Sequence, residues 1–484
     1  PIELSGISTD SDHVLVCLEG TATGQRRLLA YSDGKDGDAS PGFSMLKYMS
    51  HRPDIMRIPP MRFSIFLVTC LLLAAPAFVS AGKAIPLHQQ IDTLIEAKLA
   101  DFSKRASPVC SDAEFLRRVT LDLAATIPSR KQTEAFLKDT APSEEKRRQL
   151  VSRLLLSPRY VLRMQYLLDW ILMESRKGET VPAAEWHAYL RKSVAENKPW
   201  DALAREILGA DGANKKDRAP ARFYLDRNFE MTVVTRDVGR VFLGVDLECA
   251  QCHNHPAVDA YKQQHYHGLN AFLQRTYLFT DPKSKAKSLG EKAEGDVTFT
   301  SAFDDSKGKT APRVLDLPER IDPKETLKQY ITKPSKSARG VPKYSRRGQL
   351  GVAMTAAENI DFRLNIANRL WAAVIGRGLV EPLDLRHSAN PASHPKLLTL
   401  LGNALHEHKY DMRWFLGELV LTRTYQRSLA VKGNPGVARE HFAIGLLKPL
   451  SPEQYAWATM QATGRLDAVH KDVIAKLNTP GKAK

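Results

Sequence analysis

The residues with the clearest chemical pattern are Cys249, Cys252 and His253, which form the pentapeptide Cys-Ala-Gln-Cys-His. Two thiols separated by two residues can form thioether bonds to the two vinyl groups of one haem, and the histidine that follows directly can ligate the iron. In a chain of 484 residues, average residue usage gives such a pentapeptide by chance about once in a thousand sequences. The pattern therefore predicts one covalently attached c-type haem, held by Cys249 and Cys252, with His253 as the proximal iron ligand.

The sixth iron ligand is less clearly marked. The next methionine after His253 is Met354, far along the chain, whereas His265 and His267 follow much sooner. We therefore expect either a second histidine, His265 or His267, or an open coordination position. Each of these arrangements favours a lower reduction potential than methionine ligation does. For either histidine alone, an ordinary surface or turn position is the simpler interpretation.

The same cysteines allow other interpretations. A zinc site could use Cys249, Cys252, His265 and His267, since twelve residues separate Cys252 from His265, although the His-x-His spacing is tighter than is usual for zinc. Cys249 and Cys252 could instead form a disulfide, or the motif could be unmodified.

Residues 61–81, MRFSIFLVTCLLLAAPAFVSA, have a basic start, a short apolar stretch and a small-residue end. This pattern is typical of a secretory signal peptide, so we expect a periplasmic or otherwise exported protein. An uncleaved segment would instead associate the protein with a membrane. Residues 1–60 precede this signal and are polar, so we interpret them as a non-native or disordered upstream extension.

The formal net charge is +16, and residues 331–350 are the most basic stretch. A nucleic-acid partner is the usual suspicion for such a charge, but export argues against it. We interpret the basic stretch as a solvated linker, with a docking patch for an acidic partner, such as an exported redox protein, or for an anionic membrane surface as the alternative. Its basic residues are Lys333, Lys336, Arg339, Lys343, Arg346 and Arg347.

The spacing of apolar residues predicts a mainly α fold, with two helical domains joined by an irregular, basic and partly β-like linker. Helix starts are expected at several N-cap residues, and short β-like runs are expected at 297–303 and 313–317. The expected helix starts are Ser111, Ser157, Asn359, His394, Asp411 and Ser451. The expected domains are a helical domain carrying the Cys-x-x-Cys-His motif at 82–279, the linker at 280–350 and a helical domain at 351–484.

Motifs of common enzymes, such as a Walker A loop, a GxSxG elbow or HExxH, do not occur in the sequence. Glu381, Asp384, His387 and His394 cluster in one polar segment. We interpret that segment as a connector in which polar residues cap helices and prolines fix turns. No substrate is indicated, so enzymatic activity stays undecided.

Several stretches together resemble a known family. Residues 115–123, 154–160 and 242–256 are similar to the planctomycete cytochrome-C-like domain of unknown function. Residues 368–371, 376–382, 390–395 and 425–428 are similar to the companion domain that usually follows it. The resemblance implies a helical domain with a haem attachment motif at Cys249, Cys252 and His253, and it implies no established activity.

Three functional hypotheses follow. The first is an exported monohaem protein that transfers electrons to or from another exported redox protein. The second is a haem-free secreted scaffold or interaction protein, in which Cys249 and Cys252 form a disulfide or a zinc clip. The third is an exported enzyme in which the haem works together with the carboxy-terminal domain.

Overall fold

The computed structural model describes residues 16–20, 26–30, 85–430, 436–466 and 468–469. The chain divides into two compact units, Pro1–Ser80 and Ala81–Lys484. In the first unit, the described residues form one antiparallel hairpin of β1 (Val16–Gly20) and β2 (Arg26–Ala30). The expected signal segment at 61–81 and the rest of the upstream extension lie outside the described residues, so both stay predictions.

The second unit begins with a run of helices that ends just after the Cys-x-x-Cys-His motif. A π-helical turn, η1 (Gly239–Leu243), follows α11, and a 3₁₀ turn, η2 (Cys249–Gln251), carries the first cysteine. The α-helices of this first helical block are α1 (Leu87–Glu96), α2 (Phe102–Arg105), α3 (Asp112–Ala124), α4 (Arg130–Lys138), α5 (Ser143–Leu155), α6 (Pro158–Met173), α7 (Ala183–Ala195), α8 (Trp200–Gly209), α9 (Lys215–Arg218), α10 (Arg222–Leu225), α11 (Met231–Val238) and α12 (Gln263–Leu273).

Three antiparallel hairpins and a 3₁₀ turn follow α12, and a second helical block then completes the unit. The hairpins are β3 (Thr276–Thr280) with β4 (Lys287–Glu291), β5 (Val297–Thr300) with β6 (Lys307–Thr310), and β7 (Tyr330–Thr332) with β8 (Val341–Pro342), and the turn is η3 (Lys324–Thr326). The second block consists of α13 (Arg346–Met354), α14 (Ile360–Ile375), α15 (Pro395–Glu407), α16 (Met412–Leu421), α17 (Arg423–Gln426), η4 (Arg439–His441) and α18 (Pro452–Ala462).

The mainly α fold is thus confirmed, and so are the helix starts that local sequence predicts. Ser111, Ser157 and Asn359 each accept a hydrogen bond from the backbone N–H three residues on, at the N-termini of α3, α6 and α14. At α18, Ser451 and Gln454 form the full reciprocal capping box. Of the two expected β-like runs, 297–303 contains β5, whereas 313–317 contains no strand.

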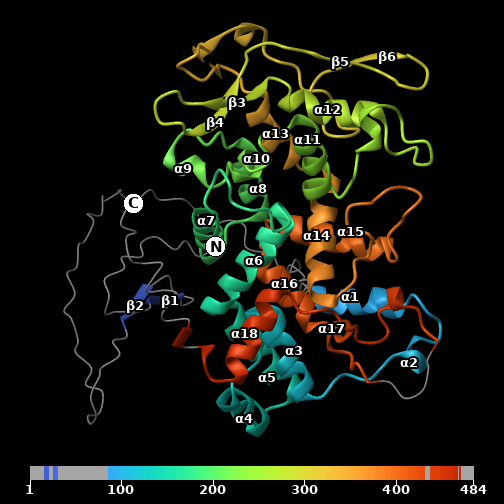
Figure 1. The fold of residues 1–484 in the computed structure, drawn as a ribbon. Coiled ribbons are helices and arrows are strands. Elements are labelled where there is room, and N and C mark those ends of the chain that lie inside the picture. The colour runs from blue at the N-terminus through green and yellow to red at the C-terminus, as the bar shows by residue number, and fades with distance from the viewer. Residues whose placement is uncertain (1–15, 21–25, 31–84, 431–435, 467, 470–484) are drawn as a thin grey trace, which may run out of the picture. The chain divides into compact units, whose positions relative to one another are not determined.

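The two helical blocks share one hydrophobic core. Figure 1 shows α14 running along the second unit from the region of α11 and α12 toward α16 and α3. The fully buried Trp200 of α8 stacks on Phe242 of η1 at 6.0 Å and on Phe362 of α14 at 6.2 Å between ring centroids. Because buried aromatic rings contribute much of a core's stability, these three side chains hold the two blocks together.

The basic stretch at 331–350 is not a wholly solvated linker, and this interpretation is corrected. Arg346 and Arg347 are buried at the start of α13. Arg346 pairs with Asp322 through two nitrogens at 2.9 Å, and Arg347 donates to the backbone carbonyls of Gly209 and Ala210. Arg339 also pairs with an acid, Asp211. Three of the six basic residues therefore make contacts that stabilise the fold, whereas Lys333, Lys336 and Lys343 are exposed.

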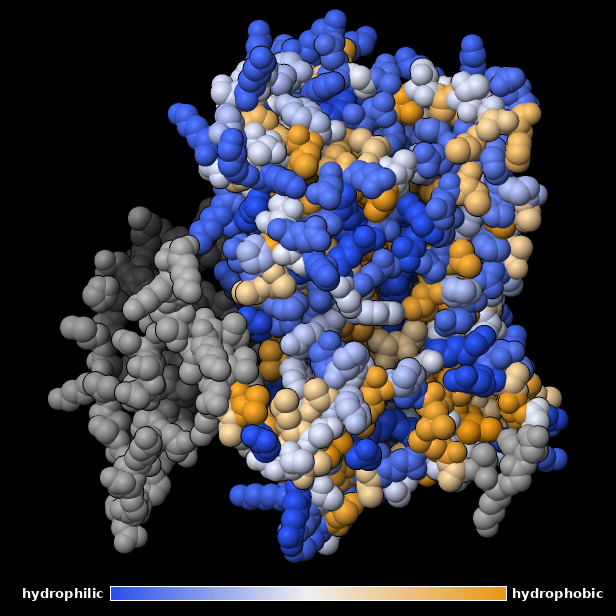
Figure 2. Space-filling view, in the orientation of Figure 1, coloured by the Kyte–Doolittle hydropathy of each residue, from blue (hydrophilic) through white to orange (hydrophobic). Residues whose placement is uncertain are grey.

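The surface is mainly hydrophilic, as Figure 2 shows for one face. A hydrophobic patch lies toward the lower right of that view, near the segment that follows α17 in Figure 1. Exposed apolar side chains in that segment include Leu429 and Leu447. Among the described residues, no helix combines the length and the apolar character that a membrane span requires.

Candidate functional site

The Cys-x-x-Cys-His turn lies at the end of a short path that leads from α11. Gly244 ends η1 with a positive φ of 70°, a conformation that favours glycine. Asp246 then fixes the approach to the turn, because its carboxylate accepts two hydrogen bonds from the Arg236 guanidinium at 2.9 and 2.7 Å and a third from the backbone N–H of Glu248 at 3.1 Å. The site therefore begins on an anchored segment.

The turn itself presents its two cysteines outward. In η2, the backbone N–H of Cys252 donates to the carbonyl of Cys249 at 3.3 Å. Ala250, between them, is only 1% exposed and packs into the core, whereas Cys249 and Cys252 are exposed and form no disulfide. The turn thus offers two free thiols on one accessible surface. Cys110 is the other thiol that the structure describes in the second unit. It lies well before the motif in the sequence and is buried, and burial raises the pKa of its thiol.

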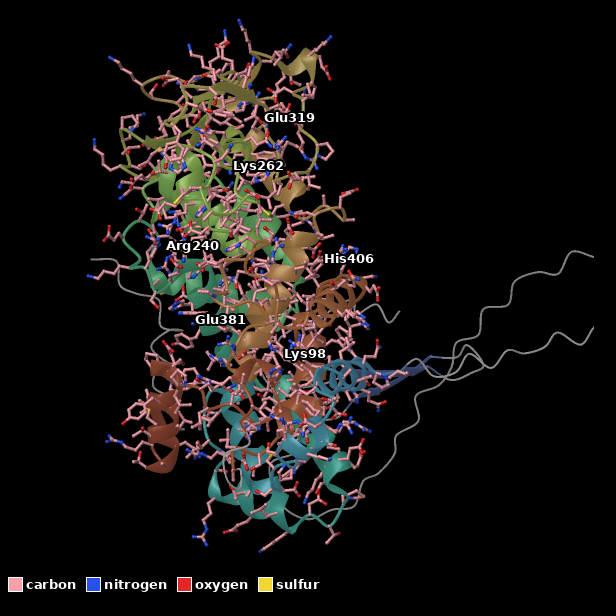
Figure 3. All side chains as sticks on the ribbon, turned by 90° about the vertical axis from the view of Figure 1, so that its right-hand side faces the viewer. Lys98, Arg240, Lys262, Glu319, Glu381 and His406 are labelled. Atoms are coloured by element: carbon pink, nitrogen blue, oxygen red, sulfur yellow. The ribbon has the colours of Figure 1, made fainter. Side chains whose placement is uncertain are left out.

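Helix α12 and the β5–β6 hairpin support the turn from its inner side. The carbonyl of Gln251 accepts a hydrogen bond from His267 Nε2 at 3.1 Å, and the carbonyl of Cys252 accepts one from the backbone N–H of Ala302 at 2.9 Å. Figure 3 labels Lys262, the residue before α12, which lies nearer the hairpin end of the molecule than Arg240 does. The motif is therefore docked between two elements that follow it in the sequence.

His253 has the hydrogen bonding that an iron ligand needs. Its Nδ1 lies 2.7 Å from the carbonyl oxygen of Asn254. Because a carbonyl only accepts, Nδ1 must carry the hydrogen, which leaves the lone pair of a neutral imidazole on Nε2. Histidines that bind metals usually make this second bond through their other nitrogen. The ring also stacks on Phe303 at 4.0 Å between centroids, so the hairpin restrains the orientation of the imidazole.

The two candidate sixth ligands have other partners. His265 is 2% exposed, with Nε2 placed 2.9 Å from Asp316 Oδ1 and Nδ1 placed 3.1 Å from the carbonyl of Ala260. His267 bonds Gln251 as described, and its ring stacks on Phe299 at 4.4 Å. Burial also lowers the pKa of His267. Ligation by His265 would require one of its two hydrogen bonds to break, whereas in His267 the bond to Gln251 occupies Nε2 alone.

The structure does not bring Cys249, Cys252, His265 and His267 together as a zinc site. Within the described ranges, no group of three or more His, Cys, Asp or Glu side chains has an arrangement that could hold a metal ion. The residues present instead fit a covalently attached haem, because two exposed thiols and an imidazole with a free Nε2 are the groups that such a haem requires.

The acidic segment that begins at Glu381 behaves mainly as a connector. Glu381 accepts a hydrogen bond from the backbone N–H of Gly378 at 2.9 Å, and Asp384 pairs with Arg240 of the first helical block at 2.8 Å. His394 is the buried N-cap residue of α15. His387 is the exception, since it is one of the residues that line a cleft between the two helical blocks.

Comparison with known proteins agrees with this description. The helical region that carries the Cys-x-x-Cys-His turn is similar to the planctomycete cytochrome-C-like family of unknown function. More particularly, residues 90–277 match PSCyt2, a protein of unknown function (DUF1549), and residues 346–482 match PSD1, also a protein of unknown function (DUF1553). The resemblance inferred from the sequence is thus confirmed. No curated protein and no solved structure matches the chain.

Sequence reasoning missed the contribution of the β5–β6 hairpin to the site. Phe299 and Phe303 stack on His267 and His253. Both lie in the β-like run expected at 297–303, but nothing in the sequence pattern indicated that this run packs against the motif. The one available signal was Phe303 itself, because a large aromatic residue directly before Asp304 and Asp305 is unusual in a polar turn.

Proposed function

We propose that this chain is an exported protein that binds one haem covalently at Cys249 and Cys252 and takes part in electron transfer. The observation that carries the proposal is the hydrogen bond between His253 Nδ1 and the Asn254 carbonyl, next to two exposed, unpaired thiols. A structural cysteine pair would not need a histidine in this tautomer. A haem bound in this way would supply an iron centre that cycles between two oxidation states.

The chain's own residues would hold and orient that group. Cys249 and Cys252 would form the two thioether bonds, and His253 would offer Nε2 to the iron. Phe303 would limit rotation of the imidazole, since its ring covers one face of His253. The turn would keep its shape through the bonds from His267 and Ala302 to the carbonyls of the motif.

The net charge of +16 supports an acidic exported redox protein as the partner, because complementary charge speeds the encounter of two proteins. Lys262 and Lys307, which are exposed, lie on the segments that pack against the motif. Export itself rests on the sequence of residues 61–81 and on the fact that covalent haem attachment takes place outside the cytoplasm.

The test is co-expression of the full chain with a c-type haem maturation system. We expect a coloured protein whose chromophore stays with the polypeptide during acid-acetone extraction and whose intact mass rises by one haem. Cys249→Ala and Cys252→Ala should each remove one thioether, which a pyridine haemochrome spectrum detects. Cys110→Ala is the matched control, because it removes a thiol outside the motif and should leave attachment unchanged.

A colourless, correctly folded product with the mass of the bare chain would overturn the proposal. A mass lower by two hydrogens would then support a disulfide, and bound zinc would support a metal clip. Turnover of a substrate that depends on Cys249 would instead favour the exported enzyme.

A further inference from the structure

A second cleft between the two helical blocks has a volume of about 410 Å³. One wall is mainly helix α6 of the first block, and the other comes from the end of α14, the segment before α18 and the first turn of α18. Cys249, Cys252 and His253 are not among the described residues that line it. Ligand-binding sites commonly measure about 300–1,000 Å³ and lie where domains meet, so the size and the position of this cleft suit a small molecule.

Three of the charged side chains in the cleft are already paired within the protein. Lys448 Nζ lies 2.6 Å from Asp122 Oδ1 and also donates to two backbone carbonyls at the end of α14, which uses all three of its N–H groups. Asp169 Oδ1 accepts a hydrogen bond from the indole N–H of Trp186 at 2.7 Å. Lys448, Asp122 and Asp169 are therefore not free to bind a ligand.

Arg163 and Glu453 are different. Arg163 Nε donates to the backbone carbonyl of Asp122 at 3.1 Å, but the two terminal nitrogens of this half-buried side chain have no hydrogen-bond partner among the described residues. The carboxylate of Glu453, which is also half-buried, has none either. None of these atoms is among the buried polar atoms that lack a partner, so they are accessible. Each of the two side chains thus brings a charge that a ligand in the cleft can reach.

The charges of Arg163 and Glu453 are neighbours that do not meet. Burial lowers the pKa of Arg163, and attraction by Asp122 and Glu453 opposes this effect only in part. No ion pair joins Arg163 to Glu453 in the part of the chain that the structure describes. A guanidinium binds a carboxylate through two parallel hydrogen bonds, and a carboxylate accepts hydrogen bonds from an ammonium. A ligand that carries both an anionic and a cationic group can therefore bridge the two side chains.

The cleft also has an apolar part. Trp170 of α6 is 53% exposed, although tryptophan side chains are mostly buried on average. Leu167, Pro449 and Leu450 line the same cleft. A ligand side chain that covers these residues gains from the removal of apolar surface from water.

We propose that this cleft binds a zwitterionic α-amino acid with an apolar side chain, whose carboxylate pairs with Arg163, whose ammonium pairs with Glu453 and whose side chain covers Trp170. A simple carboxylate would leave Glu453 unpaired, and a simple amine would leave Arg163 unpaired. The site is separate from the haem motif, and binding there does not depend on haem attachment.

The probe is radiolabelled L-phenylalanine, whose binding to the full chain is measured by equilibrium dialysis. Saturable binding is expected. Three competitors each lack one of the required groups: 2-phenylethylamine has no carboxylate, 3-phenylpropionate has no ammonium and glycine has no side chain. Each should compete at least tenfold more weakly than unlabelled L-phenylalanine. An absence of saturable binding, or equal competition by any of the three, would overturn the proposal.

Two substitutions assign the charged contacts. Arg163→Gln should weaken binding of L-phenylalanine about tenfold and should not weaken binding of 2-phenylethylamine, which has no carboxylate to lose a partner. Glu453→Gln should weaken binding of L-phenylalanine by a similar factor and should not weaken binding of 3-phenylpropionate. Glu453 has no hydrogen bond among the described residues, so its substitution leaves the fold intact. Unchanged affinity for L-phenylalanine, or an equal loss for the amino acid and its truncated form, would contradict the contact in question.

Trp170→Ala tests the apolar contact. L-Phenylalanine should bind this variant about fivefold more weakly, whereas competition by glycine should not change, because glycine has no side chain to cover the indole. Wild-type affinity for L-phenylalanine would show that the side chain does not lie against Trp170.

Arg153→Gln and Glu185→Gln are the matched controls. Arg153 is an exposed arginine in the last turn of α5, and Glu185 is an exposed glutamate in the first turn of α7, as Glu453 is in the first turn of α18. Neither residue lines the cleft. Wild-type affinity for L-phenylalanine is expected in both variants, and a tenfold loss in either would show that the charge effects do not arise in this cleft.

Discussion

Arg240 Nε lies 2.8 Å from Asp384 Oδ2 and thereby joins the helix turn that leads to the cysteines with the second helical block. The same guanidinium contacts Glu174 at 2.7 Å and Asp237 at 3.2 Å. Burial works against the charge of Arg240, but the bonds to Asp384 and Glu174 outweigh it and raise its pKa. The arginine is therefore a charged link between the blocks under all ordinary conditions.

Asp384→Asn should lower the free energy of unfolding by about 1–2 kcal/mol, because one carboxylate of a partly buried ion-pair network is lost while Arg240 stays charged. Urea denaturation measures the change. Glu134→Gln is the control, since its partner Arg130 is 93% exposed and exposed pairs contribute about 0–1 kcal/mol. Equal losses in the two variants would mean that Asp384 does not link the blocks energetically.

Substitution of His265 tests the sixth ligand. Because both ring nitrogens of His265 already have protein partners, His265→Gln should leave the absorption spectrum of the haem-loaded protein unchanged. The variant should instead lose about 1–2 kcal/mol of stability, the usual cost of a disrupted buried hydrogen bond. A shift of the Soret band in His265→Gln would show that the residue does ligate the iron, as the sequence suggested it could.

His394 should make the protein sensitive to mild acid. Burial, with Lys98 and His441, lowers its pKa from 6.5 to about 4. The unfolded chain therefore binds a proton below about pH 6.5 while the folded chain does not, so stability is lost as pH falls from 6.5 toward 4. The full effect is about 3 kcal/mol.

The measurement is the urea midpoint of wild type and His394→Gln at pH 7 and at pH 4.5. Glutamine does not titrate, so the variant should lose less stability than wild type between the two pH values. Because other groups titrate in both proteins, only the difference between their two losses of stability reports on His394. An equal loss in wild type and in the variant would contradict the lowered pKa of His394.

Arg346 and Asp322 should matter more than any exposed lysine of the basic stretch. Both are buried and share two short hydrogen bonds. Asp322→Asn leaves Arg346 partly uncompensated and should cost about 3 kcal/mol, whereas Lys336→Ala should change stability by less than about 0.5 kcal/mol. Urea denaturation compares the two variants. An Asp322→Asn protein of wild-type stability would show that Asp296, which also pairs with Arg346, is sufficient.

Features that depend on neighbouring residues were predictable from the sequence. The predicted helix caps at Ser157 and Ser451 are confirmed, because an N-cap hydroxyl accepts its hydrogen bond from a backbone N–H only three residues away. The motif at Cys249 and Cys252 was recognisable for the same reason, since its spacing is local. Residue type and short spacing carry this information directly.

Features that depend on distant partners were not predictable. The bond from Ala302 to the Cys252 carbonyl joins segments with no shared pattern, so the role of the β5–β6 hairpin was missed. Arg347 looked like a solvated charge because its acceptors, the carbonyls of Gly209 and Ala210, lie 138 and 137 residues away. Likewise, the cleft that His387 lines forms only where several separate segments of the chain meet.

The carboxylate of Asp92 in α1 caps α17, where it accepts from the backbone N–H of Arg423 and from both the N–H and the hydroxyl of Thr424. The backbone of Cys110 likewise bonds that of Gln426. Helix α1 therefore makes this contact only after Thr424, which lies 332 positions later in the chain, has been synthesised. Contacts of such long separation slow folding, so a nascent chain must remain incompletely packed, and in need of protection from aggregation, until its last helices have emerged.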